Sequence, residues 1–418
     1  MKRARIFAQK GPEVKELREK VGIVGKDFEV AVAGGGMIGA ALARALGLAQ
    51  PGARIALVSS GPVPAPAAGE GFDARVYALS PGNAGFLARL GAWRAIEERH
   101  RTPVHRMRVH GDDGASAIEF DAYRGGASEL AWIVEDRRVQ AALRGALDGQ
   151  AALSLHRSPV RGLQISETRA VLQLEDGSEV GAQLVVGADG AHSLVRERAG
   201  IASEAQSYGQ TAVVANFACE RPHRNVAFQW FQGSEKQGAI LALLPLPGDH
   251  VSMVWSVSTE HATRLLALEG EALAREVAQA SQHALGELRV VTPARGFPLQ
   301  RLAAARLAAR RVALAGDAAH VIHPLAGQGA NLGLQDAQAL AAVLGAREPG
   351  RDAGDAALLR RYERSRAEAI LAMRAAVHGL HRLFDAPGPV AARLRNAGLK
   401  LADRLPVIKN LLMRHAMQ

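Results

Sequence analysis

The sequence predicts an α/β fold in which a nucleotide-binding domain carries an inserted antiparallel sheet and ends in helices. Three observations predict this class. A strand, a glycine-rich turn, a helix and a second strand follow one another over residues 28–58, which is the order of a βαβ unit. Strand-forming runs split by turn residues fill residues 212–257. Apolar strands followed directly by Asp-Gly or Gly-Asp pairs occur within residues 184–200 and 311–340.

The composition fits a globular protein with a large core. The 418 residues suffice for two or three packed units, and 48% hydrophobic with 22% charged residues suits an α/β protein. Cys219 is the single cysteine, which excludes a disulfide framework within the chain and a cysteine metal site, and fits a reducing compartment. The apolar runs are too short for a membrane span. Residues 1–27 lack the apolar core of a signal peptide, and we interpret them as a flexible N-terminal extension or a misassigned start.

The glycine turn explains the first elements. Phe28–Ala33 is predicted to be a strand, Met37–Ala49 a helix and 54–58 the next strand. Gly34 permits the tight turn, Gly36 lets the backbone approach a pyrophosphate, and Gly39 allows close helix–strand packing. The start of the helix would stabilise phosphate charge. This pattern indicates a dinucleotide but does not distinguish FAD from NAD.

Later elements follow from periodicity and turn residues. The predicted elements are a helix from Ser80 over residues 80–96, a hairpin over 104–121, a helix over 134–147, a hairpin over 171–184 around an Asp-Gly turn, the antiparallel sheet over 212–257, and helix over 261–285. The predicted domains are an FAD- or NAD-binding part over 28–204 and 296–345, a substrate-binding sheet over 205–295, and C-terminal helices over 346–418.

The segment from 311 to 340 favours a flavin. Its GQGANLG run precedes a helix predicted from Asn331 to about residue 344. Small residues there allow a flat ring to lie against backbone N–H groups, and the helix dipole favours negative charge, which reduced flavin carries.

At these residues the chain resembles the FAD-dependent aromatic hydroxylases and, within them, the ubiquinone-biosynthesis hydroxylase family. The resemblance extends from Phe28 to the C-terminus and rests on GGGMIG, DARVYALS, GADGAHSLVR and GDAAHVIHPLAGQGANLGLQDA, with a matching C-terminal tail. It implies a Rossmann-like FAD-binding domain of the aromatic-hydroxylase type, with NADPH or NADH as reductant. It also implies hydroxylation of the ring of a polyprenylated phenol or quinone precursor by O₂, through a flavin C4a-hydroperoxide.

The resemblance also implies roles for individual residues. The pyrophosphate would lie on Gly34, Gly36 and Gly39, with Asp189 and Gly190 near it. Arg75 would lie along the cofactor, and Asp317 would accept a hydrogen bond from the ribityl chain. The isoalloxazine would be bordered by Pro324, Gly327 and Gly329, and the helix beneath it would begin with Asn331 and Leu332.

Two residues depart from the family pattern. Ser59 stands where a Glu usually binds the adenosine ribose, and Asp136 stands where an amide often contacts the flavin. Serine can bind a ribose hydroxyl but lacks the charge-assisted hydrogen bond, worth about 1.5–3 kcal/mol. Either FAD is held more weakly, or Glu70 or a backbone group substitutes for the missing acid.

The candidate catalytic residues are His320, His323 and Pro324, which lie beside the flavin segment. Structural, hydrogen-bonded histidines are the alternative interpretation. His378 and His381 lie three residues apart without a carboxylate cluster, so no metal site is expected. Six apolar residues of the inserted sheet could line a pocket for the prenylated phenol or simply form core: Trp230, Phe231, Leu243, Leu244, Pro245 and Trp255.

The net charge of +10 is concentrated at the two ends of the chain. We find no nucleic-acid module with it and expect no nucleic-acid partner. After Val390 the tail is basic and amphipathic, interrupted by Pro406. It either packs on its own domain or contacts a membrane or a biosynthetic complex. We expect a cytoplasmic protein, with peripheral contact at the inner face of the membrane as the further option. A catalytically weak scaffold of such a complex is the alternative function. Halogenation and prenyl reduction are disfavoured, since the Trp-x-Trp-x-Ile-Pro halogenase signature is absent and the tail favours the quinone family.

Overall fold

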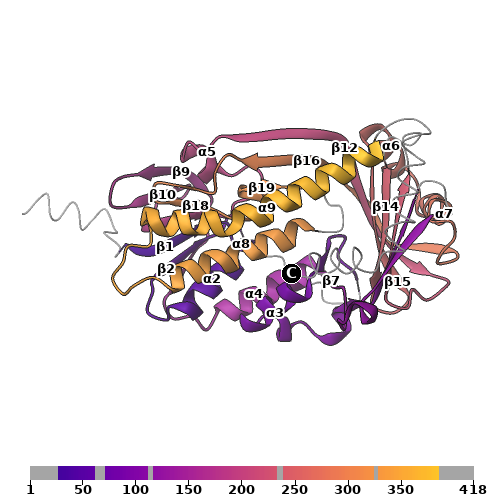
Figure 1. The fold of residues 1–418 in the computed structure, drawn as a ribbon, viewed down its shortest axis with the longest axis horizontal. Helices are drawn as coiled ribbons and strands as arrows, with labels where there is room; N and C mark the ends of the chain where they lie inside the picture. The colour runs from indigo at the N-terminus through magenta and orange to yellow at the C-terminus, as the bar shows by residue number, and fades with distance from the viewer. Residues whose placement is uncertain (1–26, 62–70, 112–115, 233–238, 324–327, 386–418) are drawn as a thin grey trace, which may run out of the picture.

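The computed structural model describes residues 27–61, 71–111, 116–232, 239–323 and 328–385, with side chains as far as residue 373. Two large sheets dominate it. Figure 1 shows the first sheet behind helices α2 and α8 in one half of the molecule, and the second sheet at the opposite end. Strands β12 and β16 run between the two halves, so the chain is tied together by long β structure.

The first sheet carries the βαβ unit. Its main order is β17-β18-β11-β1-β2-β8, with β10 and β9 attached beside β11. Within this order, strands β18, β11, β1, β2 and β8 are parallel to one another, as expected for a βαβ unit. The strands are β1 (Phe28–Ala33), β2 (Ile55–Val58), β8 (Leu153–His156), β9 (Val160–Ile165), β10 (Ala170–Leu174), β11 (Glu179–Gly187), β17 (Ala308–Ala309) and β18 (Val312–Leu314).

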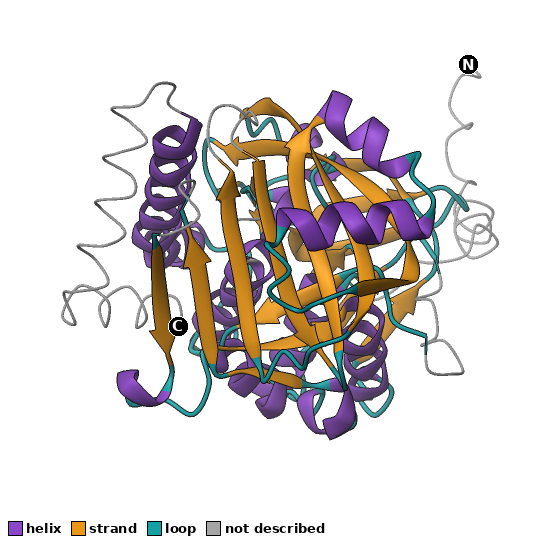
Figure 2. Ribbon diagram, turned by 90° about the vertical axis from the view of Figure 1, so that its right-hand side faces the viewer, coloured by secondary structure: helices purple, strands orange, loops and turns teal. Residues whose placement is uncertain are grey.

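The second sheet has the order β19-β16-β12-β15-β14-β13-β5-β6 and is antiparallel except where β13 meets β5. Helices α6 and α7 cover its outer face, which Figure 2 presents to the viewer. Its strands are β5 (Arg106–His110), β6 (Ala117–Asp121), β12 (Ser203–Cys219), β13 (Val226–Gln232), β14 (Ala239–Leu246), β15 (His250–Ser258), β16 (Leu288–Ala304) and β19 (His320–Val321).

A small third sheet and the helices complete the fold. The third sheet joins β3 (Val76–Leu79), β7 (Ala131–Glu135) and β4 (Thr102–Val104). The helices are α2 (Met37–Ala49), α3 (Pro81–Arg89), α4 (Asp136–Leu147), α5 (Leu194–Arg198), α6 (Thr259–Leu266), α7 (Gly270–Ala280), α8 (Gln328–Gly345) and α9 (Ala356–Asp385).

The structure confirms the predicted α/β class, the strand Phe28–Ala33, the helix Met37–Ala49, both hairpins and the antiparallel sheet. Three helix predictions were too long. The helix from Ser80 ends at Arg89, because Gly91 adopts a left-handed φ of +83°. The helix predicted from residue 134 begins at Asp136, because Val134 pairs with Tyr77 in the third sheet. The stretch 261–285 forms two helices rather than one.

The predicted domain boundaries stay predictions. The second sheet takes β5 and β6 from residues 106–121, so chain from outside 205–295 also contributes to it. The N-terminal extension up to residue 26 and the basic tail from residue 386 lie outside the described residues.

Candidate active site

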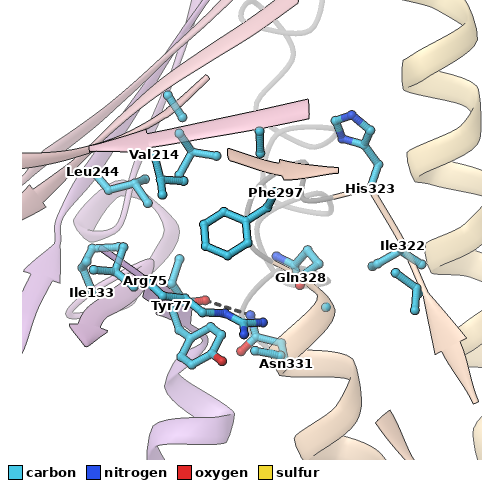
Figure 3. A pocket seen from close by; sticks show the side chains of 18 of the residues that line it. Arg75, Tyr77, Ile133, Val214, Leu244, Phe297, Ile322, His323, Gln328 and Asn331 are labelled. Atoms are coloured by element: carbon cyan, nitrogen blue, oxygen red, sulfur yellow. Dashed lines mark hydrogen bonds between the residues drawn. The ribbon is translucent and has the colours of Figure 1, made fainter. Parts of the chain in front are cut away.

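A cavity of about 640 Å³ lies between the two halves. One side, the turn wall, consists of the lining residues within 36–38, 74–80, 188–191, 315–317 and 328–331. The other, the sheet wall, consists of the lining residues of β4, β5, β7 and β12–β16. Figure 3 shows Phe297 between the two, with Val214 and Leu244 on one side of its ring and Gln328 and Asn331 on the other.

The glycine turn contributes an open helix start to the turn wall. A Cβ on Gly39 would lie 1.8 Å from the carbonyl oxygen of Gly34, so only glycine allows this close packing. A Cβ on Gly36 would meet nothing within 4 Å. Helix α2 has no side-chain cap at Gly36. Its first N–H groups are therefore available to an anion that approaches over Gly36.

Ser59 lies directly behind this turn. It is only 6% exposed, and its Oγ donates a hydrogen bond to the Gly61 carbonyl oxygen at 3.1 Å. A Cβ on Gly35 would lie 2.5 Å from that Oγ, so the serine and the turn fit closely together. Ser59 does not line the cavity, and Glu70, its suggested substitute, lies outside the described residues.

A charged cluster crosses the turn wall. Arg75 and Asp317 both line the cavity. The Arg75 guanidinium lies 5.5 Å from the centre of the Tyr77 ring, a cation–π geometry. Burial raises the pKa of the Asp317 carboxyl, against the opposing effect of Arg75 and His320. Burial likewise raises the pKa of Tyr77, which hydrogen-bonds to Asp136.

Asp136 does not reach the cavity itself, whereas Gln140, one helical turn later, does. The Gln140 Nε2 donates to the Asp136 Oδ1 at 2.7 Å. An amide side chain therefore lines the cavity one helical turn after residue 136, and the Asp136 carboxylate fixes its position. Sequence reasoning missed both Tyr77 and Gln140; the i,i+4 spacing after Asp136 was the available signal for Gln140.

The Asp-Gly pair after β11 also borders the site. Gly190 lines the cavity, and the Asp189 Oδ2 accepts a hydrogen bond from the Val195 N–H at 3.1 Å. The other oxygen, Oδ1, is buried and has no partner among the described residues. A buried carboxylate oxygen needs a donor, and a hydroxyl group of a bound nucleotide would provide one.

His320 does not line the cavity. Its Nε2 lies 2.7 Å from the Asp336 Oδ2, and the Asp336 Oδ1 accepts from the Arg366 Nε at 2.7 Å. The Gly316 N–H also donates to Asp336 at 3.0 Å. Burial alone would raise the pKa of Asp336, but His320, Arg366 and the Gly316 N–H outweigh it and bring the pKa below its ordinary value. Through the Gly316 N–H, the cluster of His320, Asp336 and Arg366 fixes the backbone of the residue that precedes Asp317.

His323 does line the cavity. It is 1% exposed, its Nε2 lies 3.2 Å from the Gln210 Oε1, and its ring meets the Tyr208 ring edge-on at 4.9 Å. Pro324 and Gly327, predicted to border the flavin, lie outside the described residues.

Asn331 ties the helix start to the opposite segment. Its Oδ1 accepts from the Ser80 N–H at 2.9 Å, and its Nδ2 donates to the Ala78 carbonyl oxygen at 2.8 Å. Asn331 and Gly329 line the cavity, whereas Leu332 does not. Helix α8 begins at Gln328, three residues before the predicted start.

The six apolar candidates on the second sheet mostly form core. Trp230, Leu243 and Trp255 pack in the core beneath α6 and α7, and Leu244 alone of the six lines the cavity. The sheet wall is built instead from the lining residues Val104, Met107, Ala131, Ile133, Ala212, Val214, Ala227, Phe228, Gln229, Ile240, Ala242, Leu244, Val254, Ser256, Phe297, Pro298, Leu299 and Gln300.

Within the part of the chain that the structure describes, no group of His, Cys, Asp or Glu side chains is arranged to hold a metal ion. No described helix is both long and apolar enough to cross a membrane.

The residues present fit FAD. The turn wall combines an uncapped helix start and an open edge at Gly36, and the unpartnered buried oxygen of Asp189 lies next to the lining residue Gly190. These groups match a pyrophosphate and the hydroxyls of a ribityl or ribose unit. The apolar sheet wall faces them across the cavity, where a flat ring and an organic substrate can meet.

The fold and the site define an FAD-dependent monooxygenase of the aromatic-hydroxylase class. A family model described as "FAD binding domain" matches residues 27–376. A solved structure of a PqsL variant from P. aeruginosa has a TM-score of 0.73 at 26% identity and covers 90% of this chain and 100% of its own.

Curated relatives narrow the class. The "Ubiquinone hydroxylase UbiL" of Rhodospirillum rubrum is 35% identical over 95% of this chain and 91% of its own length. The "3-demethoxyubiquinol 3-hydroxylase" of Escherichia coli is 34% identical over 93% of this chain and 98% of its own. The chain belongs to the ubiquinone-biosynthesis hydroxylase family.

Proposed function

We propose that this protein hydroxylates the aromatic ring of a polyprenylated phenol or quinone precursor in ubiquinone biosynthesis, with O₂ as oxygen donor and NADPH or NADH as reductant. One observation carries the proposal. A single cavity joins a nucleotide-binding edge to a wall of apolar side chains. The names of the UbiL and Escherichia coli relatives support the pathway.

The proposed contacts to the cofactor follow the turn wall. Gly34, Gly36 and Gly39 would hold the pyrophosphate, with Ser59 at the ribose, and a second set of groups would hold the remainder: Arg75, Asp189, Gly190, Asp317, Gly327, Gly329, Asn331 and Leu332. Bound at these residues and reduced by NADPH or NADH, FAD would supply the activation of O₂, from which one oxygen atom enters the ring. The apolar side chains of the sheet wall exclude water from the reacting atoms.

His323 and Pro324 are the proposed residues beside the reacting ring. Of these, His323 lines the cavity, and its hydrogen bond to Gln210 would fix the orientation of the imidazole against a substrate hydroxyl. His320 is proposed to act through the backbone of Gly316 and Asp317 rather than on the substrate, because it is held by Asp336.

The proposed location is the cytoplasm, with contact at the inner face of the membrane, because a polyprenylated substrate partitions into lipid. The basic tail that would make this contact lies outside the described residues.

The test is product analysis with purified, FAD-loaded protein. We expect NADPH or NADH oxidation that depends on a short-chain prenylated phenol and yields a product with one added oxygen atom from O₂. Asp317→Ala should lose FAD and with it the product. FAD binding without product from any prenylated phenol, together with capture of other ubiquinone-biosynthesis proteins, would favour the scaffold function instead.

A further inference from the structure

Among the polar side chains of the sheet wall, two are buried between apolar neighbours, Gln229 and Ser256. Gln229 lies opposite Ala242, which lies opposite Val254. In the next row of cross-strand neighbours on the same face, Ile240 lies opposite Ser256, and Ser256 lies opposite Ala212. Gln229 on β13 and Ser256 on β15 therefore occupy neighbouring rows of the face that lines the cavity, on either side of β14.

Both side chains are buried, and neither is hydrogen-bonded to another described residue. Gln229 is 5% exposed and Ser256 is 4% exposed. Neither side chain has a hydrogen-bond partner within the described part of the chain. The polar atoms of both side chains nevertheless keep some accessible surface. Their remaining accessible surface therefore faces the cavity they line. A buried amide or hydroxyl without a partner is costly, so these two groups favour a ligand that supplies one.

The charge of the cavity restricts that ligand. Among the described lining residues, the only Asp, Glu, Lys or Arg side chains are Arg75 and Asp317, and both belong to the turn wall. An amide and a hydroxyl can each donate and accept hydrogen bonds, which suits a phenol hydroxyl, a methoxy oxygen or a quinone carbonyl. A ring carboxylate placed there would lose its hydration without gaining a cation.

We propose that Gln229 and Ser256 bind the oxygen substituents of the substrate ring and select a neutral ring over one that carries a carboxylate. This inference rests on the proposed function and adds the residues that recognise the substituents of the substrate ring. The apolar neighbours Ala242, Val254 and Ala212 leave room for the ring itself, because their side chains are small.

The experiment titrates FAD-loaded protein with three ring ligands of equal prenyl length and follows the flavin absorption spectrum. The ligands are a prenylated phenol, the same phenol with a ring carboxylate, and a prenylated benzene without ring oxygen. The wild type should bind the phenol at least about tenfold more tightly than the carboxylate. Gln229→Met should weaken phenol binding about three- to tenfold, and Ser256→Ala about threefold, while neither changes binding of the benzene.

Ser252→Ala is the matched control. Ser252 lies on the same strand but does not line the cavity, so its variant should bind all three ligands as the wild type does. Tighter binding of the carboxylate than of the phenol by the wild type would overturn the inference. So would equal losses for phenol and benzene in Gln229→Met, since they would indicate a structural role. Hydroxylation of the phenol is measured separately. Binding seen in the flavin spectrum without any hydroxylated product would reject the proposed function, but it would still support Gln229 and Ser256 as the residues that bind the ring substituents.

Discussion

The two walls of the cavity use different parts of the polypeptide. The turn wall is made of backbone turns, helix starts and the charged pair Arg75 and Asp317. The sheet wall is made of side chains from strands that lie far apart in the sequence. A cofactor common to a whole class can be held by backbone groups, whereas a particular substrate must be recognised by side chains that vary.

This difference predicts separable effects. Changes in the turn wall and behind it should alter stability and FAD affinity, and changes in the sheet wall should alter substrate binding alone.

The largest effect is expected behind the turn wall. Asp336→Asn would leave Arg366 and His320 buried without their carboxylate, so we expect a loss of about 3–5 kcal/mol in the free energy of unfolding. The measurement is urea denaturation followed by far-UV circular dichroism. An unchanged denaturation midpoint would show that the cluster contributes nothing to the fold.

The same residue predicts a pH dependence. The pKa of Asp336 is lower in the folded protein than its ordinary value. Its stabilising contribution is therefore complete above about pH 4 and is lost as the pH falls through the folded value. The difference in stability between wild type and Asp336→Asn should shrink below about pH 4. A difference that grows in acid would contradict the sign of this shift.

Within the turn wall, two glycines should behave differently. Gly39→Ala places a methyl against the Gly34 carbonyl oxygen and should cost about 3 kcal/mol of stability through this overpacking. Gly36→Ala meets no protein atom, so its stability should change little while its FAD dissociation constant rises about tenfold, or ~1.4 kcal/mol. Thermal unfolding and FAD titration of both variants check this. Equal effects on both quantities in the two variants would mean that Gly36 is not at the open edge of the site.

The smallest expected effect is a gain. Ser59→Glu restores the acid that the family pattern places at the ribose, and should tighten FAD binding about five- to tenfold through a charge-assisted hydrogen bond. Ser59→Ala is the control and should show no gain. Unchanged affinity in the glutamate variant would indicate that another group already binds the ribose.

The same difference between the walls explains what could be predicted from the sequence. The bounds of β1 and α2 were predicted to the residue, because strand, glycine turn and helix are set by neighbouring residues. The confirmed hairpins are local in the same sense. The end of α3 was missed because the left-handed Gly91 was not recognised as a helix stop.

The sheet wall could not be predicted in this way. Both faces of strands β13, β14 and β15 are largely buried, so polar and apolar residues do not alternate along them. Gln229 and Trp230 are neighbours, yet only Gln229 lines the cavity while Trp230 packs in the core beneath α6 and α7. Which residue faces which side depends on register with β14, β15 and β12, and that information is distributed over the chain.

The separation of the two walls is tested most directly by Ala242→Leu. Ala242 lies in the middle of the sheet wall, between Gln229 and Val254. The measurement is a titration of this variant with FAD and then with a prenylated phenol, followed by flavin absorbance. Separate walls predict an FAD affinity equal to that of the wild type and no spectral response to the phenol. Loss of FAD affinity, or a full response to the phenol, would contradict it.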